Sequence, residues 1–142
     1  GEGPDRGLAE RTAADLGVSS RVTFVGAISD VETVVAGADA FLLPSDGESF
    51  GLAALEALAC GVPVVGAIAG GLPEVVTDGV DGILERVGAT DAMASRLAGI
   101  LTNAEAAARM GAAGRAKAES RYRTDLIVPQ YEAAYEAALA KP

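Results

Sequence analysis

Short apolar runs alternate with stretches of helical periodicity along the first two thirds of the chain. This alternation is typical of strand–helix units, so we predict an α/β fold with a Rossmann-like parallel sheet flanked by helices. Because the run from Val62 to Val65 is continuously apolar, we expect that strand to be central and buried on both faces. The predicted strands are Val22–Val25, Ala40–Leu43, Val62–Val65 and Gly82–Glu85.

Glycine marks the ends of two expected helices. Gly17 follows the first helix and Gly61 follows the third, and glycine readily takes the left-handed conformation that terminates a helix. Asp30 is placed to cap the second helix at its start. The expected helices are Asp5–Leu16, Val31–Ala36, Gly51–Cys60 and a short one from Pro73 to near Gly79.

From Thr90 onward the pattern is helical only, which predicts a helical C-terminal segment. Thr102 and Glu105 have the spacing of a capping box, which predicts a helix that begins there and ends near Ser120. Because proline disrupts a helix interior, we expect the last helix to begin or to bend at Pro129. A single apolar stripe on that helix is formed by Tyr131, Ala134, Tyr135, Ala138 and Leu139.

The composition narrows the class of protein. With 142 residues, of which 50% are hydrophobic and 22% charged, the chain has the size and balance of one soluble globular domain. No apolar run approaches the roughly 18 to 20 residues that span a bilayer, so we expect no transmembrane segment. A net charge of −9 opposes binding to nucleic acid, which we do not expect as a partner. The sequence leaves the oligomeric state open.

The cysteine and histidine content limits location and chemistry. Cys60 is the only cysteine, which fits a reducing compartment, and the first residues lack a signal-peptide pattern. We therefore expect a cytoplasmic protein. The absence of histidine removes the usual general base and the commonest metal ligand. Any chemistry must rest on carboxylates, backbone groups and the substrate itself.

The stretch from Pro44 to Ala57 is the best candidate for a ligand site. It follows a predicted strand, and open α/β sheets bind ligands at the carboxyl ends of their strands. A helix that starts near Gly51 offers unpaired N–H groups and a partial positive charge to a phosphate. The natural donors are the backbone amides of Phe50, Gly51 and Leu52.

Two glutamates flank this helix start. Glu48 precedes it and is placed to accept hydrogen bonds from sugar hydroxyls, whereas Glu56, about two turns later, could face a diol such as ribose. Acidic residues near a helix N-terminus also stabilise the helix dipole by about 0.3 to 1 kcal/mol, and Glu56 could simply be solvated. The spacing alone leaves both interpretations open.

The run Glu48-Ser49-Phe50-Gly51-Leu52, with Glu56 eight positions after Glu48, resembles the glutamate, seven residues, glutamate motif of family-four retaining glycosyltransferases. These enzymes have the two-domain GT-B fold. The resemblance covers nearly the whole chain. Further matching segments are Gly1–Pro4, Arg21–Gly26, Ala38–Ser45, Glu56–Val65 and Gly70–Val76.

This resemblance implies the place of the chain in a larger enzyme. Residues 1–142 would be the C-terminal donor-binding domain, truncated on its N-terminal side, with the acceptor domain absent. The donor would be a nucleotide-diphosphate sugar, and transfer would retain the anomeric configuration without a metal or other cofactor. The small-molecule or glycan acceptor would be bound by the absent domain.

The resemblance also implies residue roles. Glu48 would be the catalytic-site carboxylate that binds the donor-sugar hydroxyls, and Glu56 would hold the ribose hydroxyls. Sugar and diphosphate oxygens would be bound by the backbone of Ser49, Phe50, Gly51 and Leu52. The base would be contacted by backbone groups of Phe24, Val25 and Gly26.

Within the family, some segments most resemble the members that transfer N-acetylglucosamine from UDP-N-acetylglucosamine to L-malate in bacillithiol biosynthesis. These segments are Val25–Val31, Glu48–Leu52, Ile127, Gln130–Glu132 and Tyr135. The Arg and Lys with which the family binds the donor phosphate have no counterpart here. We therefore expect this chain alone to be inactive in transfer.

Two other functions stay open at this point. One is a nucleotide-sugar binding module without catalysis, because fold does not dictate function and the cationic residues are missing. The other is a hexosamine epimerase on the same architecture, which would need different acid–base residues. An Arg and a Lys in a glycine-containing loop before Gly1 would indicate the glycosyltransferase.

Three weaker signals have alternative explanations. Gly70 and Gly71 either contact a ligand or only shape a turn. The segment Asp78–Gly82 faintly resembles a calcium loop, but its missing ligands favour a tight turn. We expect the basic residues from Arg109 to Arg123 to lie on a solvated face.

Overall fold

The computed structural model describes residues 3–140, which form two compact units divided after Val31. The first unit contains α1 (Arg6–Asp15), the short 3-10 helix η1 (Ser19–Arg21) and a following irregular segment. α1 stops as predicted, because Gly17 takes the left-handed conformation with a φ of 67°. The first two residues of the chain, which belong to the segments that carry the family resemblance, lie outside the described residues.

The predicted strand at Val22–Val25 is wrong. The structure has no strand there, and Val25 is 51% exposed. An apolar run predicts burial, but a strand also needs a hydrogen-bonded neighbour, and no strand among residues 3–140 pairs with this run. Phe24 instead lies under the guanidinium of Arg6, whose central carbon is 5.5 Å from the ring centroid.

The second unit is built around a parallel sheet of three strands, in the order β1 (Phe41–Leu43), β2 (Val64–Ala67) and β3 (Gly82–Glu85). The strand predictions for this part are confirmed, although β2 begins at Val64 instead of Val62. All of β2 is buried, as predicted for the central strand.

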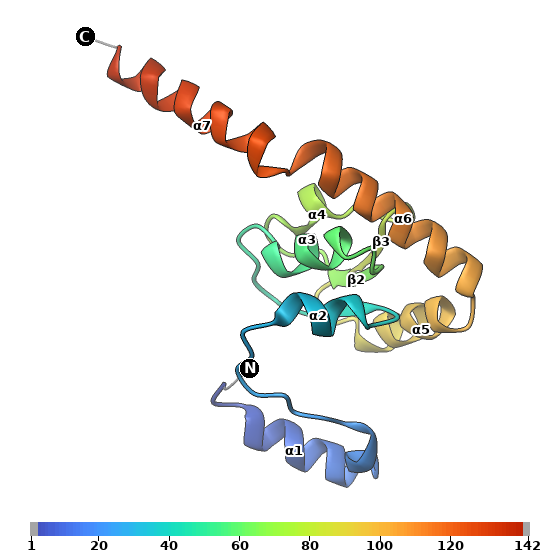
Figure 1. The fold of residues 1–142 in the computed structure, drawn as a ribbon. Helices are drawn as coiled ribbons and strands as arrows, with labels where there is room; N and C mark the ends of the chain where they lie inside the picture. The colour runs from blue at the N-terminus through green and yellow to red at the C-terminus, as the bar shows by residue number, and fades with distance from the viewer. Residues whose placement is uncertain (1–2, 141–142) are drawn as a thin grey trace. The chain divides into compact units, whose positions relative to one another are not determined.

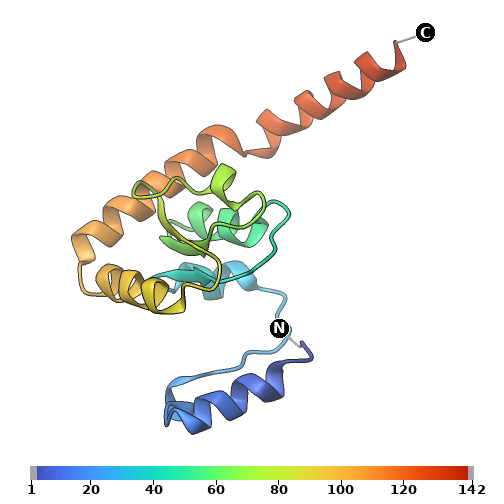
Figure 2. The ribbon, with the colours of Figure 1, turned by 180° about the vertical axis from the view of Figure 1, so that it is seen from behind.

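Helices cover both faces of this sheet (Figures 1 and 2). The helices that follow the first unit are α2 (Val31–Ala36), α3 (Leu52–Ala59), α4 (Leu72–Val75), α5 (Thr90–Leu101), α6 (Ala104–Arg121) and α7 (Thr124–Leu139), of which α7 does not cover the sheet. On one face, residues of α2, α3 and α4 form a core with Leu58 and Val64, which are fully buried. On the other face, Met93 and Ile100 of α5 pack with Val65. The α/β architecture and the helical C-terminal segment are therefore confirmed.

The start of α6 corrects one prediction. Asn103, and not Thr102, is the N-cap, and its side-chain oxygen accepts a hydrogen bond from the N–H of Ala106 at 3.0 Å. Thr102 instead donates from Oγ1 to the carbonyl oxygen of Ala98, while Glu105 forms an ion pair one turn further along. The capping-box pattern placed the N-cap one residue too early, because the neighbouring asparagine is at least as good a cap as threonine.

The ends of α4 and α7 also differ from the prediction. α4 ends at Val75, well before Gly79, because the chain turns where the Asp81 carboxylate accepts the N–H of Thr77 at 2.7 Å. α7 begins at Thr124, so it does not begin at Pro129, which lies inside the helix as its sixth residue. Proline at this position cannot donate the hydrogen bond to the carbonyl oxygen of Asp125.

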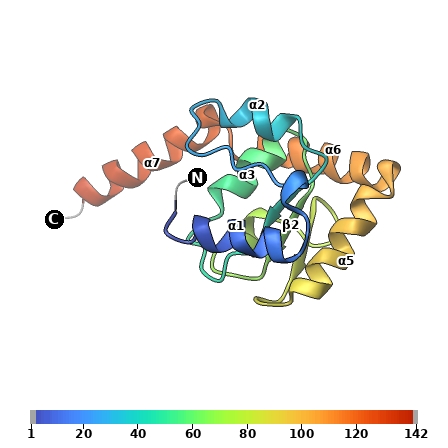
Figure 3. The ribbon, with the colours of Figure 1, turned by 90° about the horizontal axis from the view of Figure 1, so that it is seen from below.

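The last helix exposes its apolar stripe. α7 has no buried residue, and Tyr131 and Tyr135 are 62% and 68% exposed. Figure 3 shows α7 extending beyond the sheet. None of the helices between residues 3 and 140 is both long and apolar enough to cross a bilayer.

Candidate functional site

The loop between β1 and α3 lies at the carboxyl end of a parallel strand, as predicted. Gly51 caps α3 with a left-handed φ of 96°, a conformation that favours glycine. Oε1 of the half-buried Glu48 accepts a hydrogen bond from the N–H of Gly51 at 3.2 Å. The N–H groups of Phe50 and Leu52 donate to no atom among residues 3–140. The loop therefore presents two free amides beside a carboxylate, while the third expected donor, Gly51, is engaged.

A pair of glycines from the next strand–helix connection presses against this loop. The N–H of Gly71 donates to the carbonyl oxygen of Glu48 at 3.1 Å. A Cβ on Gly70 would overlap that same carbonyl oxygen, and a Cβ on Gly71 would lie 2.6 Å from the carbonyl oxygen of Ser49. The glycines therefore allow two loops to pack backbone against backbone, which supports the turn-shaping interpretation.

Glu56 lies on α3 beyond this loop. It is the fifth residue of the helix, so at about 1.5 Å per residue it lies roughly 7 to 8 Å along the axis from Gly51. The side chain is exposed, and its carboxylate has no hydrogen bond or ion pair with residues 3–140. Its neighbours Ala57 and Leu58 are fully buried. Glu56 is thus free to bind a ligand in solution.

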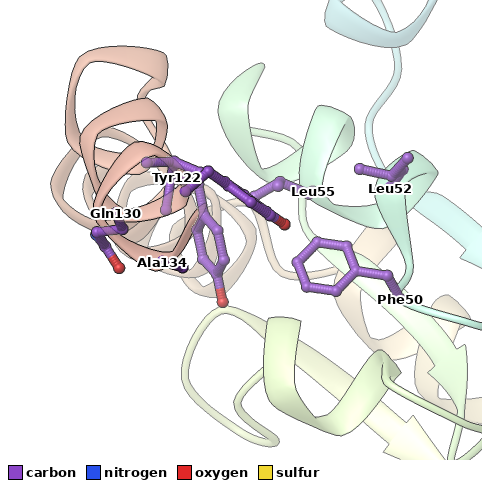
Figure 4. Close-up of a pocket in the computed structure, with 8 residues that line it drawn as sticks. Phe50, Leu52, Leu55, Tyr122, Gln130 and Ala134 are labelled. Atoms are coloured by element: carbon purple, nitrogen blue, oxygen red, sulfur yellow. The ribbon is translucent and has the colours of Figure 1, made fainter. Parts of the chain in front are cut away.

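An open pocket of about 750 Å³ adjoins the loop on its apolar side. Figure 4 shows Phe50, Leu52 and Leu55 on one wall and Tyr122 on the other. The rings of Phe50 and Tyr122 meet edge to face, with centroids 6.1 Å apart and an interplanar angle of 73°. The hydroxyl of Tyr122 donates to the carbonyl oxygen of Glu74 at 3.2 Å.

The structure contains a buried ion pair next to the end of α4 that the sequence pattern did not predict. Nζ of Lys117 lies 2.7 Å from the carboxylate of Asp81, and the two side chains are 11% and 2% exposed. The same ammonium donates to the carbonyl oxygen of Val75 and to Oγ1 of Thr77. The expectation of a solvated face is therefore wrong for this lysine. The signal was the neighbouring run of buried small residues on α6, which are Gly111, Gly114 and Ala118.

The remaining predicted residues are distributed between the two units. Glu48 to Leu52 form one loop with Glu56 on the attached helix, whereas Phe24 to Gly26 belong to the first unit. Among them, Phe24 and Val25 are exposed. The segment around Asp78 is a tight turn, in which its carboxylate accepts the N–H of Leu84 at 2.9 Å. Residues 3–140 contain no group of three or more Cys, Asp or Glu side chains that could hold a metal ion.

Similar sequences point to one class of enzyme. Residues 1–117 match the family model described as glycosyl transferases group 1. The chain is 38% identical over 135 residues to N-acetyl-alpha-D-glucosaminyl L-malate synthase of Bacillus anthracis, covering 95% of this chain and 35% of the relative. It is 45% identical over 137 residues to D-inositol 3-phosphate glycosyltransferase of Mycolicibacterium paratuberculosis, covering 92% and 31%. The chain thus spans about a third of these relatives.

Solved structures agree with this result. Anabaena Alr3699/HepE in complex with UDP has a TM-score of 0.89 and 29% identity, over 92% of this chain and 36% of that one. Sucrose-phosphate synthase from Thermosynechococcus elongatus has a TM-score of 0.92 and 31% identity, over 97% and 35%. The fold is that of the GT-B glycosyltransferases, and the chain belongs to the glycosyl transferases of group 1.

Proposed function

We propose that the chain is the C-terminal donor-binding domain of a retaining glycosyltransferase and that it binds a nucleotide-diphosphate sugar at the start of α3. The observation that carries this proposal is the pair of free amides, Phe50 and Leu52, beside the carboxylate of Glu48. A helix N-terminus with free N–H groups favours a phosphate. Complexes of the similar Anabaena HepE with UDP and with UDP-glucose support this class of ligand.

Each residue then has a separate task. The free amides hold diphosphate oxygens together with the backbone of Ser49, and Glu48 accepts hydrogen bonds from hydroxyls of the transferred sugar. Glu56, exposed and unpaired among the described residues, holds the two ribose hydroxyls. Backbone groups of Phe24 to Gly26 contact the base. No metal is needed for this arrangement.

Transfer depends on stabilising the charges that develop during the reaction and not on a strong base. The anomeric carbon becomes cationic as the bond to the diphosphate breaks, and fixed dipoles stabilise the charge that develops on the departing oxygen. The departing phosphate accepts the acceptor's proton, so the absence of histidine is compatible with transfer. The acceptor and the phosphate-binding cations come from another domain, so this chain alone is inactive.

The donor and acceptor that we propose are UDP-N-acetylglucosamine and L-malate, in a cytoplasmic step of bacillithiol biosynthesis. The name of the relative that is 38% identical over 95% of this chain supports the N-acetylglucosaminyl group and L-malate, and the UDP complexes of HepE support the nucleotide. An inositol phosphate acceptor is the second candidate, favoured by the relative at 45% identity. A non-catalytic binding module and a hexosamine epimerase lack such support.

Calorimetric titration of the chain with UDP tests the donor site. We expect weak binding that falls about tenfold in Glu56→Ala, because two hydrogen bonds to ribose are lost. Glu136→Ala is the matched control, since Glu136 is an exposed glutamate on α7 and should leave the affinity unchanged. Equal affinity of both variants and the parent chain would remove Glu56 from the site.

A further inference from the structure

Glycine is required at position 71, the second residue of the turn that contacts Glu48, because there is no room for a side chain. Its backbone conformation does not require glycine. Gly71 has a φ of −81°, which any residue adopts. A Cβ there would nevertheless lie 2.6 Å from the carbonyl oxygen of Ser49 and 3.0 Å from Cα of Phe50. Both neighbours are backbone atoms, which cannot rotate aside as a side chain does. Any side chain at Gly71 must therefore push the loop away.

The residue that follows this turn covers the start of α3. Leu72 is 1% exposed, and its Cδ1 lies 3.0 Å from the place of a Cβ on Gly51. Together with the hydrogen bond from Gly71 to Glu48, this contact encloses the Glu48–Gly51 segment from one side. The position of α4 consequently sets the position of the loop.

α4 is in turn held by α6. The ammonium of Lys117 binds the carbonyl oxygen of Val75, the last residue of α4, at 2.7 Å. The hydroxyl of Tyr122 binds the carbonyl oxygen of Glu74 at 3.2 Å. The Tyr122 ring also meets Phe50, so this one side chain touches both α4 and the loop.

We propose that Gly71 and Tyr122 are positioning residues for the donor loop: Gly71 fixes the Glu48–Ser49 backbone, and Tyr122 ties α4 and Phe50 to α6. The orientation of Glu48 and of the free amides then depends on residues that do not touch the ligand. The consequence for donor binding rests on the proposed function, but the positioning itself does not.

Amide hydrogen exchange of the isotopically labelled chain measures the positioning directly. In Gly71→Ala we expect the protection of the Gly51 amide, bonded to the Glu48 carboxylate, to fall about tenfold, because the loop opens locally. The amides of β2 report global folding and should keep their protection. Two glycine variants are controls, because a Cβ on Gly79 or Gly99 meets no atom within 4 Å. Gly79→Ala adds the strain of a positive φ, here 74°, which Gly71→Ala lacks, so Gly99→Ala is the matched control.

Tyr122 provides the second variant. Tyr122→Phe keeps the ring against Phe50 and loses only the hydrogen bond to Glu74, so we expect a fall in Gly51 protection of about threefold. Tyr122→Ala loses both contacts and should give about tenfold. The conservative variant thus keeps about half of the effect in free energy, and unchanged protection of the β2 amides in both variants separates positioning from general destabilisation. Unchanged Gly51 protection in both Gly71→Ala and Tyr122→Ala overturns the proposal.

UDP titration of the same variants separates the two proposals. If the parent chain binds UDP, Gly71→Ala and Tyr122→Ala should weaken binding in proportion to the lost protection, and full affinity would overturn the link to the donor. If the parent chain does not bind UDP, the proposed function fails for this chain, while the exchange data still decide whether Gly71 and Tyr122 position the loop.

Discussion

The carboxylate of Glu48 accepts a hydrogen bond from the backbone N–H of Gly51 at 3.2 Å, so the glutamate is bonded to the N-cap residue of α3. The acidic residue expected to bind a sugar therefore has a structural partner when no ligand is present. A donor phosphate that takes the Gly51 amide has to replace this contact. The two roles of Glu48, as the acceptor for Gly51 and as a sugar ligand, predict separable effects of substitution.

Substitution of Glu48 tests the strength of its bond to Gly51. Glu48→Ala removes the acceptor for Gly51 and should lower the free energy of unfolding by about 0.5 to 1.5 kcal/mol, the net contribution of one hydrogen bond. Glu48→Gln keeps an oxygen acceptor and should lose less than half of that. Urea denaturation of the three proteins measures the difference. Equal stability of Glu48→Ala and the parent chain would show that this hydrogen bond does not contribute.

The buried ion pair between Lys117 and Asp81 predicts a large loss of stability when the lysine is replaced, and a partial recovery when the aspartate is replaced as well. Lys117→Met leaves Asp81, which is 2% exposed, without its cation, and should lower the free energy of unfolding by about 3 to 5 kcal/mol. Adding Asp81→Asn removes the uncompensated charge, so the double variant should be more stable than Lys117→Met alone. Chemical denaturation of both variants measures this. Additive losses would contradict a direct pairing.

The contact of α3 with α6 predicts a different glycine effect. A Cβ on Gly111 would overlap the carbonyl oxygen of Gly61, so Gly111→Ala should lower the free energy of unfolding by about 1 to 3 kcal/mol. Gly99→Ala is the matched control in α5, where a Cβ meets no atom within 4 Å. Because alanine favours a helix over glycine, the control should raise stability by about 0.5 to 1 kcal/mol. Thermal denaturation with the opposite order would contradict the close packing.

The corrected start of α6 gives a further test. Asn103→Ala removes the side-chain oxygen that accepts the N–H of Ala106, at a cost of about 1 kcal/mol. Thr102→Ala removes only the hydroxyl's bonds back to the carbonyl oxygens of Ala98 and Gly99 in the preceding helix and should cost less. Denaturation midpoints rank the two variants. A larger loss at Thr102 would return the cap to the position that the capping-box pattern indicates.

The sequence predicts the parts of this fold that depend on local pattern. The run at Val64 is buried on both faces and reads as a central strand, and the glycine at Gly51 marks the helix start. The strand prediction at Val22–Val25 is wrong because a strand forms only beside a pairing neighbour, which a local pattern does not report. The bond from Lys117 to Val75 joins positions 42 residues apart, so only the tertiary fold reveals it. The same holds for the contact between Gly71 and Glu48.

The claim that the start of α3 holds the diphosphate is tested most directly by following the backbone amide resonances of the labelled chain during titration with UDP. We predict that the largest shifts occur at Phe50 and Leu52, whose N–H groups are free, and that uridine without phosphates does not shift them. Saturation with UDP that leaves Phe50 and Leu52 unmoved, or shifts confined to other elements, would contradict the proposed donor site.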